Sequence, residues 1–284
     1  MAERLPAMEA GRSGSEAVLM RTLAFLYHDI VPRGRFSISG FQSPDADIYK
    51  LDCGEFEKHL KCISEVLDTP PDGSPEARVN DDFRVLLTFD DGGVSASSYT
   101  ADLLEQFGWR GYFFVTTDWI NRPGFLSESQ ISDLYRRGHI IGSHSCSHPP
   151  RMSRCSRQQL DREWQQSVQR LTQTLDAEVS SASVPGGYFS REVAAAAAAA
   201  GIRCLFTSEP VASRLEIEGC SVFGRFSVQQ GVSADWVSAL AAGQASPRIQ
   251  RYLFWNAKKV IKTLGGQAWL RLRQEVLARR SGDR

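Results

Sequence analysis

Two adjacent carboxylates and a spaced pair of histidines are the residues of this chain that most favour chemistry. Asp90 and Asp91 follow the apolar run Val85-Leu86-Leu87, and His144 and His148 come further along the chain. Two imidazoles and one carboxylate suit Zn²⁺, although another divalent ion of the first row could take the place, and they leave open positions for water and substrate. The second carboxylate then remains free as a base. This combination predicts hydrolysis of an unactivated amide or ester.

The local geometry of the histidine pair has two alternatives. In a helix, His144 and His148 would share a face while Cys146 points away. In an extended strand, positions 144, 146 and 148 would share a face, and Cys146 would become a candidate ligand. Because two prolines follow and prevent simple continuation of a helix, we favour a strand end that curls into a turn. We therefore expect Asp91, His144 and His148 to be the metal ligands and Cys146 to be a packing residue.

Short apolar runs alternate with helical patterns along most of the chain. The expected strands are Leu23–Tyr27, Arg84–Phe89, Gly111–Val115, His139–Gly142, Ser181–Val184, Cys204–Thr207 and Ser221–Phe226. The expected helices lie near 53–67, 98–107, 127–137, 156–175, 190–200 and 233–242. Strands separated by helices predict a parallel sheet, and a regular series of such units favours an α/β protein with a TIM-like (β/α) barrel. The candidate chemical residues fall at the C-terminal strand ends, where barrel enzymes carry their active sites.

Three regions are expected: a tail over residues 1–20, a barrel over 21–243 and a basic amphipathic helical appendage over 244–284. We favour a helical cap for the appendage, and the alternative is a basic surface for a membrane or a partner protein. The long polar segment Pro32–Lys50 directly follows Tyr27-His28 at the end of a strand, so we expect it to be a lid.

The bulk composition excludes some classes of function. A formal net charge of zero argues against nucleic acid as the main partner. No apolar stretch is long enough to span a membrane, and the first 19 residues lack the apolar segment of a secretory signal, so we expect a cytoplasmic protein. The six cysteines include no Cys-x-x-Cys pair and are interpreted as reduced thiols. No feature of the sequence predicts an oligomeric state.

The motifs Thr88-Phe89-Asp90-Asp91-Gly92 and His144-Ser145-Cys146-Ser147-His148-Pro149 resemble the first two signatures of the polysaccharide deacetylases. These are the NodB-homology proteins, or carbohydrate esterase family 4, and the resemblance spans roughly Leu23 to Phe226. It implies a distorted (β/α)7 barrel in which Asp90 is the catalytic base. It also implies that Asp91, His144 and His148 bind the metal.

The third signature departs from the family pattern. Ser183 stands where the family has an arginine that steadies the base, in the stretch Ser183-Val184-Pro185-Gly186-Gly187-Tyr188. The backbone N–H of Gly186 could still stabilise an oxyanion. We expect Arg225, at the end of a later strand, to supply the missing charge.

The fifth signature, a late histidine that serves as general acid, has no counterpart because no histidine follows His148. A branch of the family that deacetylates poly-N-acetylglucosamine in biofilms is similar to this chain in carrying the histidine early, so Tyr27-His28 makes His28 the expected acid. The predicted function is metal-dependent removal of N-acetyl, or O-acetyl, groups from an acetylated glycan or sugar precursor in exopolysaccharide or cell-envelope biosynthesis. The alternatives are a metal amidohydrolase acting on a small non-sugar amide and a non-catalytic glycan-binding protein on a decayed deacetylase fold.

Overall fold

The computed structural model describes residues 21–71 and 83–257 of the 284-residue chain. The expected tail over residues 1–20 and most of the expected appendage, from residue 258 onward, lie outside the described residues. Within the described ranges, no helix is both long and apolar enough to cross a membrane.

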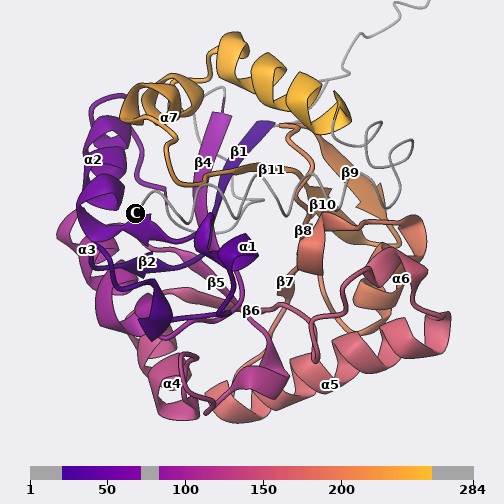
Figure 1. Cartoon of the computed structure of the whole chain (residues 1–284). Helices are drawn as coiled ribbons and strands as arrows, with labels where there is room; N and C mark the ends of the chain where they lie inside the picture. The colour runs from indigo at the N-terminus through magenta and orange to yellow at the C-terminus, as the bar shows by residue number, and fades with distance from the viewer. Residues whose placement is uncertain (1–20, 72–82, 258–284) are drawn as a thin grey trace, which may run out of the picture.

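A nine-stranded sheet with the order β11-β1-β4-β5-β6-β7-β8-β10-β9 forms the centre of the molecule (Figure 1). Neighbouring strands are parallel except for β9 and β10, which pair antiparallel. The strands are β1 (Arg21–Tyr27), β4 (Phe83–Phe89), β5 (Tyr112–Val115), β6 (Ile140–Ser143), β7 (Ser181–Ser183), β8 (Cys204–Phe206), β9 (Arg214–Ile217), β10 (Cys220–Phe223) and β11 (Arg225–Ser227). A separate small parallel pair joins β2 (Ile30–Val31) to β3 (Leu51–Asp52).

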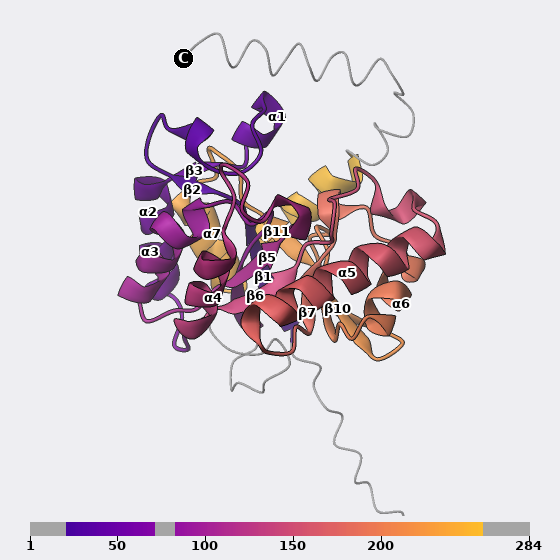
Figure 2. The ribbon, with the colours of Figure 1, turned by 90° about the horizontal axis from the view of Figure 1, so that it is seen from below.

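Helices surround these strands on the outside, and Figure 2 shows α1 and its flanking loops standing at one end of the molecule. The helices are α1 (Pro44–Asp47), α2 (Cys53–Ser64), α3 (Ala101–Gln106), α4 (Glu128–Arg136), α5 (Arg157–Leu175), α6 (Arg191–Ala199) and α7 (Ala234–Ala241). A π-helical turn (Ala96–Thr100) precedes α3, and residues 245–257 are also helical. Ser127 and Ser156 open α4 and α5 with complete capping boxes, which satisfy the first N–H groups of those helices.

The expected strand Ser221–Phe226 is two strands, because the chain bends at Gly224. β10 pairs with β8 and β11 pairs with β1, so this one segment passes between the two ends of the curved parallel sheet. A Cβ atom at position 224 would lie 2.4 Å from the carbonyl oxygens of both Glu209 and Val211, so only glycine fits here. Counting β10 and β11 as one unit, seven parallel units make up the sheet, as the family resemblance implies.

Alternation of side chains along each strand separates the inside of the sheet from the layer under the helices. One buried cluster consists of alternate residues on five strands: Ala24, Leu86, Tyr112, Phe114, Cys204, Phe206 and Phe223. Their sequence neighbours Leu23, Phe25, Val85 and Leu87 belong to the larger cluster that includes residues of α2, α3, α4 and α7. The inward-facing side chains of each strand form a row, called here the inner row. Each inner row leads to polar residues at the C-terminal end of its strand, and these residues form the site.

Candidate functional site

The inner rows of the strands lead directly to the candidate residues at the C-terminal ends. Alternation from Ala24 reaches His28, alternation from Leu86 reaches Asp90, and Arg225 follows Phe223 by two positions. The same parity along β6 brings His144 to this end. All four residues line one pocket with a volume of about 400 Å³, which also contains Asp91, His148 and Gly186. The structure therefore brings together every candidate site residue that the sequence indicated.

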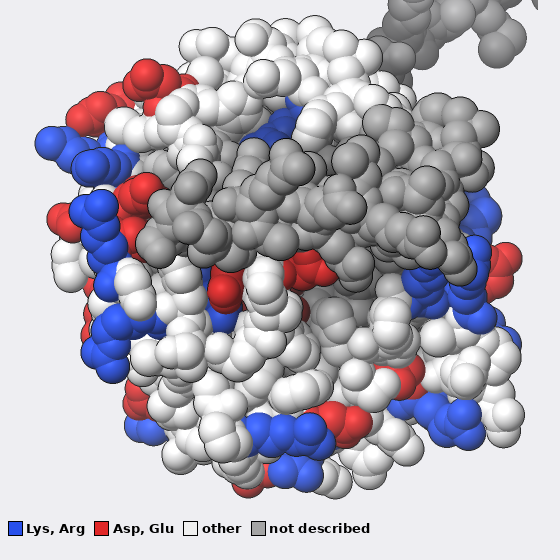
Figure 3. Space-filling view, viewed as in Figure 1, with Lys and Arg blue, Asp and Glu red and all other residues white. Residues whose placement is uncertain are grey.

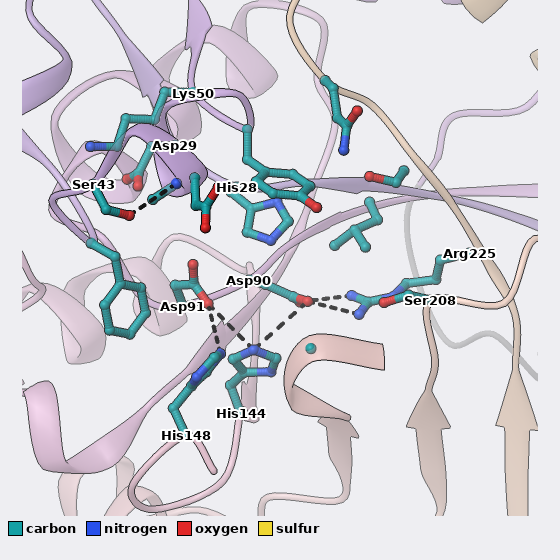
Figure 4. A pocket seen from close by; sticks show the side chains of 18 of the residues that line it. His28, Asp29, Ser43, Lys50, Asp90, Asp91, His144, His148, Ser208 and Arg225 are labelled. Carbon is teal, nitrogen blue, oxygen red and sulfur yellow. Dashed lines mark hydrogen bonds and ion pairs between the residues drawn. The ribbon is translucent and has the colours of Figure 1, made fainter. Parts of the chain in front are cut away.

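Asp91, His144 and His148 place one potential ligand atom each within 4.8 Å of one another. An oxygen of Asp91 lies 3.4 Å from Nε2 of His144 and 3.6 Å from Nε2 of His148 (Figure 4). Two ligand atoms that are each about 2.1 Å from a tetrahedral zinc ion lie about 3.4 Å apart, so the donor types and their spacing both fit a metal.

Left-handed backbone conformations make this convergence possible. Asp91 has a φ of 76° and His148 a φ of 58°, whereas side chains normally favour negative φ. Neither a helix nor an extended strand passes through residues 144–148, because Ser145 also has a positive φ, of 63°. The expected turn after the strand is therefore what the structure contains. Backbone strain of this kind is common where side chains must converge at a functional site.

Cys146 does not belong to the cluster of potential ligands. Its thiol donates to Asp118, 3.1 Å away, and lies 3.6 Å from a side-chain oxygen of Gln166. Burial and the nearby carboxylate raise the pKa of this thiol to about 12, so the thiolate that a metal or a nucleophilic reaction requires is disfavoured.

Ser183 connects His144 to Asp90. Nδ1 of His144 lies 2.5 Å from the Ser183 hydroxyl, and that hydroxyl donates to Asp90 across 3.0 Å. Because the carboxylate only accepts, the hydroxyl proton points to Asp90 and Nδ1 of His144 must be the donor in its own contact. In a neutral His144 this arrangement leaves the lone pair on Nε2, the nitrogen that would bind a metal. Without a metal, burial is outweighed by the carboxylates of Asp90 and Asp91, which raise the pKa of His144, so that Nε2 carries a proton that it donates to Asp91. Sequence reasoning treated Ser183 only as a missing arginine and did not identify this connection.

Arg225 forms a fully buried, two-pronged ion pair with Asp90, with both nitrogen–oxygen distances at 2.7 Å. Nε of the same guanidinium donates to the carbonyl oxygen of Thr207 at 2.9 Å, and Nη1 contacts the hydroxyl of Thr88 at 3.2 Å. These contacts fix the plane of the guanidinium and hence that of the carboxylate.

Positive charge keeps both carboxylates ionised in spite of their burial. Burial by itself would raise the pKa of Asp90, but Arg225 and His144 outweigh it and hold that pKa below its usual value. Burial is likewise outweighed at Asp91, whose pKa is lowered by the hydrogen bond from His144 and by His28 and His148. For His148, burial and the neighbouring His144 lower the pKa, which favours the neutral imidazole that a metal requires.

His28 faces the two carboxylates from the side opposite His144 and His148 (Figure 4). Its ring packs against Tyr49 with centroids 4.7 Å apart, and its buried Nδ1 has no hydrogen-bond partner among the described residues. An imidazole in this place can still donate to or accept from a group that enters the pocket.

The expected lid Pro32–Lys50 contains a 3-10 turn (Phe36–Ile38) and α1, and it forms one wall of the pocket through Phe41, Ser43 and Tyr49. Buried contacts anchor it. Asp29 accepts hydrogen bonds from Ser39 and Ser95, and Lys50 donates to the carbonyl of Phe36 while pairing with Asp47. The pocket wall is thus fastened to the end of β1.

A second wall of the pocket was not expected from the sequence. Arg251, Phe254 and Trp255 line the pocket, and all three belong to the helical residues 245–257. The sequence pattern indicated an amphipathic helix here but gave no sign of where it would pack.

The chain is similar to known proteins in sequence and in fold. Residues 77–205 match the model of the polysaccharide deacetylase family. Chitin deacetylase of Colletotrichum lindemuthianum is 32% identical over 80 residues, which are 28% of this chain and 32% of that protein. YxkH of Bacillus subtilis (strain 168) is named as a polysaccharide deacetylase. It is 25% identical over 185 residues, which are 63% of this chain and 66% of that protein. The matches therefore span less than two thirds of either relative.

Solved structures share the fold. The deacetylase PplD of Streptococcus pyogenes superposes with a TM-score of 0.62 at 16% identity, covering 76% of this chain and 96% of that one. IcaB of Ammonifex degensii gives a TM-score of 0.63 at 18% identity, covering 78% and 97%. From the family match we conclude that residues 77–205 belong to a polysaccharide deacetylase domain of the NodB-homology type, carbohydrate esterase family 4.

Proposed function

We propose that this protein is a metal-dependent hydrolase that removes acetyl groups from the amino sugar of a glycan or glycan precursor. The observation that carries the proposal is the pairing of two adjacent carboxylates with different surroundings. Asp91 shares a cluster with His144 and His148, while Asp90 is held by Arg225 and Ser183. One carboxylate is thereby assigned to a metal and the other is kept for proton transfer.

The cluster of Asp91, His144 and His148 would hold a divalent ion, with Zn²⁺ as the best match to these donors. When bound, such an ion polarises the carbonyl oxygen of the substrate and lowers the pKa of a water molecule next to it. Ser183 supports the cluster by fixing the tautomer of His144, so that Nε2 remains available as a ligand.

Asp90 accepts the proton of the attacking water, which adds to the acetyl carbon. Arg225 keeps Asp90 ionised and in one orientation for this transfer. The N–H of Gly186, on the pocket wall, stabilises the oxyanion that forms. His28 then gives a proton to the departing nitrogen as the carbon–nitrogen bond breaks, which yields acetate and a free amine. We place this reaction in exopolysaccharide or cell-envelope biosynthesis.

Acetate release measured on a panel of N- and O-acetylated sugars tests the proposal. We expect N-acetylated amino sugars to be hydrolysed, activity to disappear after chelation of the metal, and Zn²⁺ to restore it at one ion per chain. Release of acetate that is unaffected by chelation would contradict metal dependence. Hydrolysis of small non-sugar amides in preference to every sugar would favour a different amidohydrolase. Sugar binding without any turnover in the metal-loaded protein would favour a glycan-binding protein.

A further inference from the structure

The helical residues 245–257 are part of the pocket and not only a cap beside the barrel. Arg251, Phe254 and Trp255 lie on the pocket wall. The Trp255 ring also packs over the turn that contains Gly186, because a Cβ placed on Gly187 would lie 3.3 Å from it. A substrate that reaches the candidate active site therefore meets this helix.

Arg251 brings a positive charge to the pocket that has no acidic partner among the described residues. The other two basic side chains on the pocket wall are paired, Arg225 with Asp90 and Lys50 with Asp47. Arg251 is half-buried and stacks on the ring of Trp236, 4.7 Å from its centroid. Burial lowers the pKa of this guanidinium, which nevertheless stays charged at neutral pH. A charge partly removed from water and left unpaired at a cavity is suited to an anionic group on the ligand.

The same helix carries exposed apolar side chains, of which Phe254 shares the pocket-facing side with Arg251 because the two are three residues apart. Four of the seven exposed large hydrophobic residues of the described chain belong to it: Ile249, Tyr252, Leu253 and Phe254, with exposed fractions between 47% and 62%. Figure 3 shows recessed basic surface directly beneath this helix, which carries mostly uncharged surface itself. Exposed apolar residues gathered in one place commonly mark a binding surface.

We propose that Arg251 binds the phosphate of an amino sugar that is linked through that phosphate to a lipid. This inference rests on the proposed deacetylation and narrows its substrate. The sugar enters the pocket of about 400 Å³ with its acetyl group at Asp90 and Asp91. Its phosphate pairs with Arg251, and the first part of the lipid lies along Phe254, which lines the pocket and has an exposed outer side. A nucleotide-linked sugar shares the phosphate but has polar groups where this surface is apolar.

The test compares four N-acetylglucosamine compounds: the methyl glycoside, the 1-phosphate, the nucleotide diphosphate derivative and a polyprenyl-phosphate-linked form in detergent micelles. Wild type is expected to show a kcat/KM about tenfold or more higher for the 1-phosphate than for the methyl glycoside, because a charge-assisted pair with phosphate forms. Arg251→Gln is expected to reduce this ratio to near one, and Arg251→Lys to retain part of it. Arg248→Gln is the matched control, because Arg248 lies on the same helix and donates to the carbonyls of Gly243 and Gln244 outside the pocket.

The lipid part has its own control pair. Phe254→Ser is expected to lower kcat/KM for the lipid-linked compound several-fold relative to the 1-phosphate, because Phe254 lies on the pocket wall beside Arg251. Leu215→Ser, at an exposed leucine on β9, is expected to leave that ratio unchanged. Preference for the nucleotide derivative over the lipid-linked form would overturn the lipid assignment.

Calorimetric binding of the 1-phosphate and the methyl glycoside separates this inference from the proposed function. Equal affinity and equal turnover of both compounds would overturn the phosphate site while the deacetylase proposal survives. Tighter binding of the 1-phosphate that is lost in Arg251→Gln, without acetate release from any compound, would support the phosphate site and contradict the deacetylase proposal. Melting temperatures of all variants show whether each is folded.

Discussion

Replacing Asp90 by asparagine is expected to lower kcat for acetate release by about 10²–10⁴-fold, because the side chain can no longer accept the proton of the attacking water. Metal content is expected to remain at the wild-type level, since Asp90 is not a member of the ligand cluster. The measurement is steady-state acetate release together with metal analysis of the same preparation. Asp133→Asn, which removes a carboxylate on the exposed side of α4, serves as the control and is expected to keep full activity.

The contact with Arg225 adds a second test of the same carboxylate. Arg225→Gln is expected to slow turnover and also to destabilise the fold by about 3–5 kcal/mol, because Asp90 is left buried without its partner. If both residues act through one group, the double variant should be about as slow as Asp90→Asn alone. Full turnover in a folded Arg225→Gln protein would show that Arg225 does not position the base. Full turnover in Asp90→Asn would exclude Asp90 as the base.

Replacing His28 by alanine is expected to cost about 10²–10⁴-fold in kcat on an N-acetylated sugar, because the departing nitrogen must be protonated before it can leave. Metal content should again be unchanged. The loss should be much smaller on an acetyl ester of a nitrophenol, whose leaving group needs no proton. His28→Gln retains hydrogen bonding without acid–base capacity and is the matched comparison.

Two outcomes would contradict the role of His28. The first is wild-type turnover of the amide by His28→Ala. The second is an equal loss on the amide and on the activated ester, which would indicate that His28 shapes the pocket against Tyr49 and does not transfer a proton.

Most of the fold could be predicted because each element has a local signal. Apolar runs of strand length and amphipathic stretches recur in turn, and all seven expected strands and all six expected helices have counterparts at closely similar positions. Ser221–Phe226 is an exception, because this single expected strand is two strands in the structure. The cause is a contact with residues distant in the sequence. The sequence shows an uninterrupted strand pattern, but carbonyls of a loop around Glu209 and Val211 leave space only for Gly224.

The candidate site could be predicted in part for the same reason. Strand parity and the strand ends place His28, Asp90, His144 and Arg225 on one side of the sheet, and parity is visible in the sequence. The positive φ of His148 and the bridge through Ser183 depend on the finished loops, so no local pattern indicates them. The length of Pro32–Lys50 and its position after β1 predicted that it would lie over the strand ends, where it forms a wall of the pocket; its closure as a lid stays a prediction. Arg251 gave no such signal, because helix docking is decided by surfaces far apart in the chain.

The central claim is that one divalent ion binds Asp91, His144 and His148 while Asp90 remains unliganded beside it. Crystals grown with Zn²⁺ and examined for anomalous scattering at the zinc edge test it most directly. The expected result is a single strong peak about 2.0–2.2 Å from Nε2 of both histidines and from a carboxylate oxygen of Asp91, with Asp90 still paired to Arg225. A peak coordinated by Asp90 or Cys146, or no peak in this pocket at saturating metal, would contradict the account.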